Sequence, residues 1–163
     1  MPDMLPYIEW LEGTWPSTLI RDAKWLFPMI EMVHLFGIVT LVGTTLALDL
    51  RLMDLWLRRW PVSLLAGSLL PWSWVGFAVM VLTGSGLFIS DPVRFFYNDS
   101  FRVKMVLIML AGMNAFVFQR TAYRSVVQWD LNTDTPRGAK VAGLCSLVLW
   151  FGIVAAGRWI AFV

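Results

Sequence analysis

The chain has 163 residues, of which 58% are hydrophobic and only 15% are charged. Soluble domains carry about 25% charged residues, so this composition excludes an ordinary water-soluble protein and indicates an integral membrane protein in a lipid bilayer. The formal net charge of +2 comes from basic residues that are scattered along the chain. No basic tract is present, and we therefore expect no nucleic-acid partner.

Residues 1–24 form an N-terminal segment that does not resemble a secretory signal peptide. Residues 1–20 contain three acidic residues, no Lys or Arg, and no continuous apolar core. From Met4 to Trp15, aromatic and polar residues mix in a pattern typical of a short amphipathic helix. We expect this helix to lie on the membrane surface.

Four apolar stretches follow, each close to the ~20 residues that a helix needs to cross a bilayer. We place these helices at residues 25–48, 69–89, 103–127 and 141–163. The second helix is expected to start around Pro71, because proline suits a first helical turn. Residues 91–100 have a loop-like but aromatic composition and are expected to fold back onto the membrane interface.

Short connections between four helices favour an up-and-down antiparallel bundle. The predicted fold is therefore all-α, with residues 1–163 forming a single transmembrane domain. The two predicted loops on one side hold seven Lys or Arg residues, against six on the other. Three of those six, Arg102, Lys104 and Arg158, lie at or inside apolar segments. Without them the positive-inside rule predicts a multi-pass protein of the bacterial inner membrane with both termini in the periplasm.

Ionisable residues inside the apolar segments are the strongest indication of a functional site, because each one costs insertion energy. His34, the only histidine, follows Glu31 by three residues, so the two side chains share a helix face. In an up-and-down bundle Lys104 and Arg158 fall in the same half of the membrane. With the small residue Gly37 and the polar Asn114, the predicted cofactor-binding set is Glu31, His34, Gly37, Lys104, Asn114 and Arg158.

Haem b is the cofactor that this set predicts. Membrane bundles hold haem by axial imidazole, with basic residues near the propionates and glycine where the ring meets a helix. His34 would ligate the metal. A second axial ligand would come from a methionine, from a partner subunit, or be absent; the candidates are Met80, Met105, Met109 and Met113. The predicted role is electron transfer or an accessory redox subunit.

Three other interpretations use the same residues. A carboxylate-bridged di-metal centre is excluded, because it needs a second Glu in an apolar segment and none exists. Proton or ion transfer through Glu31, His34 and Asp49 remains an alternative, although the inverted repeat of a transporter is missing. A buried polar network that fixes helix register would instead make the chain a structural or assembly subunit, within a homo-oligomer or a larger complex. Asp49 and Arg51 are expected to form an ion pair at a helix end.

Several motifs together resemble a bacterial family of small four-helix membrane proteins that is catalogued as a domain of unknown function. They are Pro28-Met-Ile-Glu-Met-Val-His-Leu-Phe-Gly37, Asp49-Leu-Arg51, Pro71-Trp-Ser-Trp-Val-Gly76, Asn98-Asp-Ser-Phe-Arg-Val-Lys104 and Ala156-Gly-Arg158. The resemblance runs from about Tyr7 to Val163 and implies the fold but no reaction.

A second resemblance involves the histidine of the first helix and the segment Phe101-Arg-Val-Lys104 that opens the third. This arrangement is similar to HemJ-type protoporphyrinogen oxidases and to CopD-like membrane domains. The HemJ resemblance implies that His34 and Lys104 are associated with haem b and activity. It makes porphyrinogen oxidation the enzymatic alternative to electron transfer.

Overall fold

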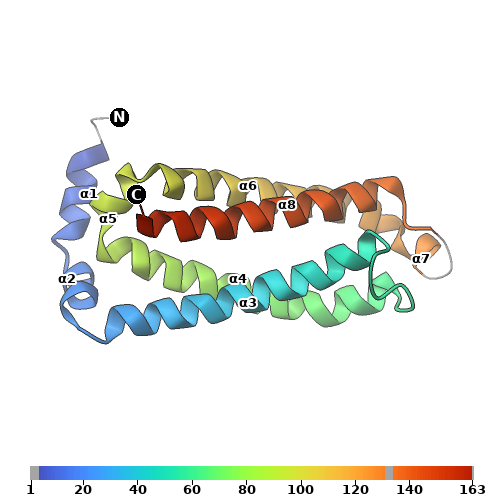
Figure 1. Cartoon of the computed structure of the whole chain (residues 1–163), viewed down its shortest axis with the longest axis horizontal. Coiled ribbons are helices and arrows are strands. Elements are labelled where there is room, and N and C mark those ends of the chain that lie inside the picture. The colour runs from blue at the N-terminus through green and yellow to red at the C-terminus, as the bar shows by residue number, and fades with distance from the viewer. Residues whose placement is uncertain (1–3, 131–133, 163) are drawn as a thin grey trace.

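The computed structural model describes residues 4–130 and 134–162, and this part of the chain is helical without a strand. Four long helices form its body: α3 (Leu26–Leu52), α4 (Val62–Ser90), α6 (Asp99–Arg120) and α8 (Arg137–Trp159) (Figure 1). The shorter elements are α1 (Leu5–Glu12), α2 (Trp15–Asp22), α5 (Pro92–Tyr97), α7 (Val126–Trp129) and the 3₁₀ turns η2 (Ala122–Ser125) and η3 (Ile160–Phe162).

Four segments that contain the long helices have the length and apolar character of membrane spans. Their mean hydropathy lies between 1.7 and 1.9, and at most 17% of the most apolar window of each is buried inside the protein. Most of the apolar surface therefore faces outward, which suggests a lipid bilayer environment. These are the properties of a membrane protein.

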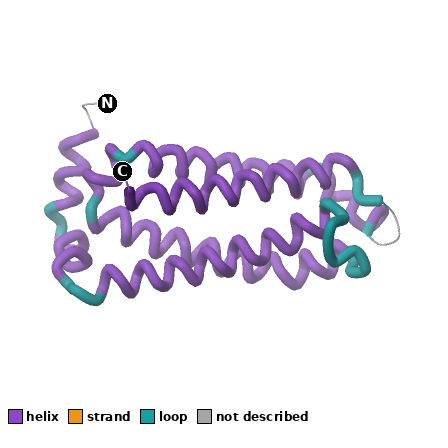
Figure 2. Tube along the Cα trace, viewed as in Figure 1, coloured by secondary structure: helices purple, strands orange, loops and turns teal. Residues whose placement is uncertain are grey.

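The long helices lie as two pairs, with α3 along α4 and α6 along α8, and α3 also contacts α8. Both described ends of the chain lie at one end of the bundle, together with α1, α2 and α5 (Figures 1 and 2). We call this the terminal end. At the opposite end, the loop end, lie the connection between α3 and α4, η2 and α7.

The contact between α3 and α4 is close enough that glycine is required. A Cβ atom added to Gly76 would lie 2.8 Å from the backbone nitrogen of Leu41, and one added to Gly37 would lie 3.0 Å from Cγ1 of Val79. Further along, the hydroxyl groups of Thr44 and Ser73 form a hydrogen bond of 2.8 Å between the helices. Small residues that let backbones approach are typical of helix pairs in membranes.

Arg51 connects the elements of the loop end. Its side chain is 3% exposed, and Nε donates to the carbonyl of Trp60 at 2.8 Å. The guanidinium also donates to Asp54, Thr135 and the carbonyl of Asp130. The predicted pair between Asp49 and Arg51 is replaced by a pair between Arg51 and Asp54, because residues two apart on a helix point in different directions.

Asp54 is the acidic centre of the same cluster. Lys140 pairs with Oδ2 at 2.8 Å, and the hydroxyl of Thr135 donates to Oδ1 at 2.8 Å. Partial burial opposes ionisation, but these hydrogen bonds and the charges of Lys140 and Arg51 outweigh it and lower the pKa of Asp54 below its ordinary value. The cluster joins the α3–α4 connection to the start of α8.

Several helix boundaries differ from those predicted, and the two largest differences are at the start of α4 and the end of α6. The second long helix begins at Val62, so Pro71 lies inside it. Its early start is explained by packing, because Val62 and Ala66 are fully buried in a small core at the loop end. The third ends at Arg120, and the residues up to 127 belong to η2 and the separate helix α7.

The segments predicted as a loop and as one surface helix are also built differently. Residues 91–100 are mostly helical, since the side chain of Asp91 caps α5 by accepting from the Arg94 N–H and that of Asn98 caps α6 by accepting from the Phe101 N–H. The N-terminal segment contains two short helices, α1 and α2, where one was expected.

Candidate functional site

His34 lies on α3 near the terminal end of the bundle and points toward α4. Its side chain is 8% exposed, and Nδ1 is 2.8 Å from Oγ1 of Thr83 on α4. The Thr83 hydroxyl donates its only hydrogen to the carbonyl of Val79 at 2.6 Å. When Thr83 accepts from the imidazole, Nδ1 carries the proton and Nε2 is the nitrogen left for a ligand.

Gly84 lies beside the imidazole. A Cβ atom added to Gly84 would lie 3.4 Å from Cε1 of His34, in ordinary van der Waals contact with the ring. Thr83 therefore holds the ring by a hydrogen bond, and the next residue of α4 packs against it. The ring is held in place by α4 and does not depend on a mobile loop.

Lys104 brings a positive charge to this site from α6. Its side chain passes over Gly157 of α8, where an added Cβ would lie 3.5 Å from Nζ. The ammonium group interacts electrostatically with His34. The α3–α4 pair and the α6–α8 pair thus each carry one ionisable group near the terminal end, and that the two groups form one site stays a prediction.

The other predicted site residues lie in separate surroundings, and none of the four forms a hydrogen bond or ion pair with the His34 side chain. Glu31 is exposed on α3. Arg158 is exposed at the terminal end, with its guanidinium 4.9 Å from the ring centre of Phe162. Gly37 lies in the contact between α3 and α4 described above. Asn114 donates to the carbonyl of Ala142 at 2.9 Å, ten residues along α6 from Lys104. Cofactor binding by these four residues stays a prediction.

The sequence analysis did not single out Thr83, Gly84 or Gly157 as site residues. The available signal was the run Thr83-Gly-Ser-Gly86, in which four small residues interrupt an apolar helix close to its end. In a membrane span such a run allows another helix or a flat group to approach the backbone.

The donor set limits what His34 could bind. Within residues 4–130 and 134–162, no group of three or more His, Cys, Asp or Glu side chains is arranged to hold a metal ion. A bare divalent ion needs three or four protein ligands. A porphyrin supplies four nitrogen ligands itself and requires only one from the protein. The single imidazole therefore fits a metalloporphyrin and does not fit a bare metal ion.

The fold and this site define a small helical protein with four helices of membrane-spanning length, a buried imidazole on α3 and a half-buried ammonium group on α6. The chain belongs to a family of unknown function (DUF6644), whose model matches residues 7–163. No curated protein and no solved structure matches the chain. The similarity to HemJ-type and CopD-like proteins therefore rests on His34 and the segment around Lys104 alone.

Proposed function

We propose that the protein spans the bacterial inner membrane as an up-and-down bundle and binds one haem b through Nε2 of His34, as an electron-transfer or accessory redox subunit. The observation that carries the proposal is the hydrogen bond between His34 Nδ1 and the Thr83 hydroxyl. Metal-ligating histidines donate their second N–H to a fixed acceptor, which sets the tautomer and the ring orientation. Thr83 is positioned to act as that acceptor.

Lys104 is suited to the charge of the cofactor. Haem b carries two propionates, and a carboxylate in a low-dielectric site needs a cationic partner. The ammonium of Lys104 lies close enough to interact with His34 and has no acidic partner among the described residues. Arg158, at the same end of the bundle, is the candidate partner for the second propionate.

The methionines named from the sequence are poorly placed to supply a second axial ligand. Met80 packs into the α3–α4 contact, where its Cγ would be 3.1 Å from a Cβ added to Gly37. Met105, Met109 and Met113 are exposed on the outer surface of α6. We therefore propose that the iron has a single protein ligand within one chain. Such a haem binds carbon monoxide, which a haem with two strong protein ligands does not do readily.

Absorption spectra of the protein purified in detergent test the proposal. The native protein is expected to show a Soret band that shifts when carbon monoxide is added to the reduced form, and His34→Ala is expected to remove the band. Thr40→Val is the matched control, since the Thr40 hydroxyl bonds only to Phe36 of its own helix. A colourless native protein from cells with ample haem would refute haem binding.

The orientation is tested separately. We propose that the basic loop end lies in the cytoplasm and both termini in the periplasm. A C-terminal alkaline phosphatase fusion is then expected to be active, because this reporter works only in the periplasm. An inactive phosphatase fusion together with a fluorescent C-terminal GFP fusion would reverse the orientation.

One observation favours a second candidate, a non-catalytic structural or assembly subunit. The His34–Thr83 bond has a neighbour in the Thr44–Ser73 bond, so His34 also acts as one of two polar links between α3 and α4. His34→Asn keeps a side-chain N–H for Thr83 but binds haem poorly. If this variant assembles with its partners and functions normally, the structural role is favoured.

The enzymatic alternative, porphyrinogen oxidation, rests on the HemJ resemblance. It predicts that this chain restores haem synthesis in a strain that lacks its own protoporphyrinogen oxidase. A strain that stays haem-deficient while producing the protein would contradict it.

A further inference from the structure

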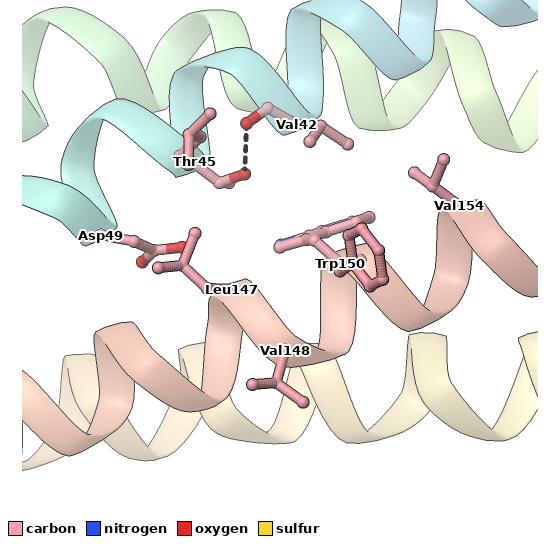
Figure 3. Close-up of a pocket in the computed structure, with 9 residues that line it drawn as sticks. Val42, Thr45, Asp49, Leu147, Val148, Trp150 and Val154 are labelled. Carbon is pink, nitrogen blue, oxygen red and sulfur yellow. Dashed lines mark hydrogen bonds between the residues drawn. The ribbon is translucent and has the colours of Figure 1, made fainter.

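A cavity of about 450 Å³ lies between α3 and α8, away from His34 (Figure 3). Its wall is almost entirely apolar, with Val42 and Leu46 on α3 and Phe151 and Val154 on α8. Cavities of this size hold ring-sized organic ligands. Because Phe151 is exposed at the rim, the cavity opens toward the surroundings of the helices, which in a membrane are lipid.

Asp49 is the only acidic side chain in this wall. Its side chain is 6% exposed, and Oδ2 is buried without a hydrogen-bond partner in the described part of the chain. The hydroxyl of Ser146 interacts with the carboxyl group, which leaves part of its acceptor capacity unused. A buried acceptor that lacks a donor costs about 1 to 3 kcal/mol, so an unpaired carboxyl oxygen beside a cavity indicates a missing ligand atom.

Among the described residues, no neighbouring cation pairs with the Asp49 carboxyl group. Arg51 points into the loop-end cluster, where it bonds to Asp54 and Trp60. On the opposite helix, Gly143 packs against the backbone of Asp49, with an added Cβ 3.1 Å from the Asp49 carbonyl. Asp49 therefore lies in the wall of the cavity with a buried carboxyl oxygen that no described residue pairs.

The other polar groups in the wall define what the ligand must offer. The Thr45 hydroxyl donates to carbonyls of its own helix, to Leu41 at 2.8 Å and Val42 at 3.1 Å, so it presents only lone pairs. The indole of Trp150 lies across the cavity from α8, with its nitrogen end turned toward the side where Asp49 lies (Figure 3). The cavity thus offers acceptors on α3 and one N–H donor on α8.

We propose that this cavity binds a membrane-dissolved hydroquinone, with one ring hydroxyl donating to Asp49 and accepting from the Trp150 N–H. A phenolic hydroxyl has one hydrogen and free lone pairs, and it therefore satisfies both groups at once. Apolar side chains and the indole face enclose the ring. The proposal goes beyond haem binding and does not depend on it.

Other occupants match the wall less well. A lipid acyl chain fills the apolar space but leaves Asp49 and Trp150 unpaired. A quinone has only carbonyl acceptors, so it pairs with Trp150 and gains a second bond at Asp49 only if that carboxyl group is protonated. Contact with a second copy of the chain covers the rim at Phe151 but supplies no donor for Asp49. The hydroquinone is the occupant whose chemistry fits both polar groups.

Isothermal titration calorimetry tests the proposal, with the full chain in phosphatidylcholine nanodiscs under anaerobic conditions. The probe is tetramethylhydroquinone, and its oxidised form, tetramethylbenzoquinone, is the matched ligand. We expect the hydroquinone to bind at least tenfold more tightly, which corresponds to about 1.4 kcal/mol. Equal affinity of the two forms would overturn the proposal.

Two variants examine the polar groups separately. Asp49→Leu removes the acceptor at similar volume and is expected to weaken hydroquinone binding at least tenfold, while the thermal midpoint stays the same or rises because an unpaired buried polar group is lost. Trp150→Phe keeps an aromatic ring and is expected to weaken binding threefold to tenfold. Trp74→Phe, which changes an exposed tryptophan on α4, is the control.

The hydroquinone-binding experiment and the haem experiment can fail independently of each other. A colourless protein that binds hydroquinone refutes the haem proposal alone, and a haem protein that does not bind hydroquinone refutes this one alone. Unchanged hydroquinone affinity in Asp49→Leu would also overturn it. If native mass spectrometry finds dimers or retained phospholipid that dissociate in Asp49→Leu, with no hydroquinone binding, the cavity belongs to those occupants instead.

Discussion

Replacing Gly76 by alanine is expected to separate α3 from α4. The added Cβ would lie 2.8 Å from the Leu41 nitrogen, 3.1 Å from the Gly37 carbonyl oxygen and 3.1 Å from the Leu41 Cβ. Ordinary contacts begin at 3.4 Å, so α3 would have to move by about 0.6 Å, and two of the three atoms belong to backbone that cannot rotate away. Overpacking of this kind costs about 1 to 3 kcal/mol.

The helix propensity of alanine opposes this cost. Alanine is favoured over glycine by about 1 kcal/mol inside a helix, which leaves a net loss of up to about 2 kcal/mol for Gly76→Ala. Gly67→Ala is the matched control, because Gly67 lies on the same helix and an added Cβ there meets nothing within 4 Å. The control should be neutral or more stable by as much as about 1 kcal/mol.

Unfolding of both variants in mixed micelles, followed by circular dichroism during titration with sodium dodecyl sulfate, measures this difference. Gly76→Ala should unfold at a lower detergent fraction than the native protein, and Gly67→Ala at the same or a higher one. If the two variants are equally stable, the close contact between α3 and α4 is wrong. Because His34 lies on the same side of α3 as Leu41, Gly76→Ala should also weaken any ligand held by His34.

The loop end and the histidine site give three further predictions. Arg51→Met should destabilise the protein by about 1 to 3 kcal/mol in the same titration, because it leaves the carbonyls of Trp60 and Asp130 without the arginine donor. The exposed Arg59→Met should change stability by less than about 0.5 kcal/mol, and equal effects would refute the role of the cluster. Since the folded state lowers the pKa of Asp54, its contribution to stability is present above the unfolded pKa of about 3.9 and is lost as the pH falls through the folded value. Asp54→Asn should therefore flatten the stability profile below about pH 4, and an unchanged profile would contradict this. Thr83→Val removes the acceptor of His34 Nδ1 and should shift or weaken the Soret band, while Thr40→Val leaves it unchanged; identical spectra would separate Thr83 from the site.

Much of the fold follows from the sequence because the four apolar stretches are long enough to cross a bilayer. The ends of the helices were harder to predict, since they depend on tertiary contacts and on caps. Val62 extends α4 because it is buried against the loop-end core, and the side chains of Asp91 and Asn98 convert an expected loop into helix starts. Neither effect appears in hydropathy.

The sequence predicts the positions of the site residues along their helices, but it does not predict which faces of the helices contact each other. The position of His34 and Lys104 along their helices places both near the terminal end of the bundle, and their joint role in one site stays a prediction. The partner of His34 could not be predicted, because α3 and α4 are apolar on nearly all faces and periodicity does not tell which faces meet. In lipid the contact is decided by small residues such as Gly76 and Gly84, whose spacing fits several registers.

Helix α3 has two different sides, and this difference separates the two proposed sites. On the side toward α4, glycine contacts and hydroxyl bonds fix the helices, and His34 is held there by Thr83. On the side toward α8 lies an open cavity with the unpaired Asp49, fifteen residues from His34 or about 22 Å along the helix. A rigid contact suits a permanently bound group, and an open cavity suits a ligand that exchanges with the membrane. The same helix is thus suited to holding a fixed cofactor at one depth and a mobile hydroquinone at another.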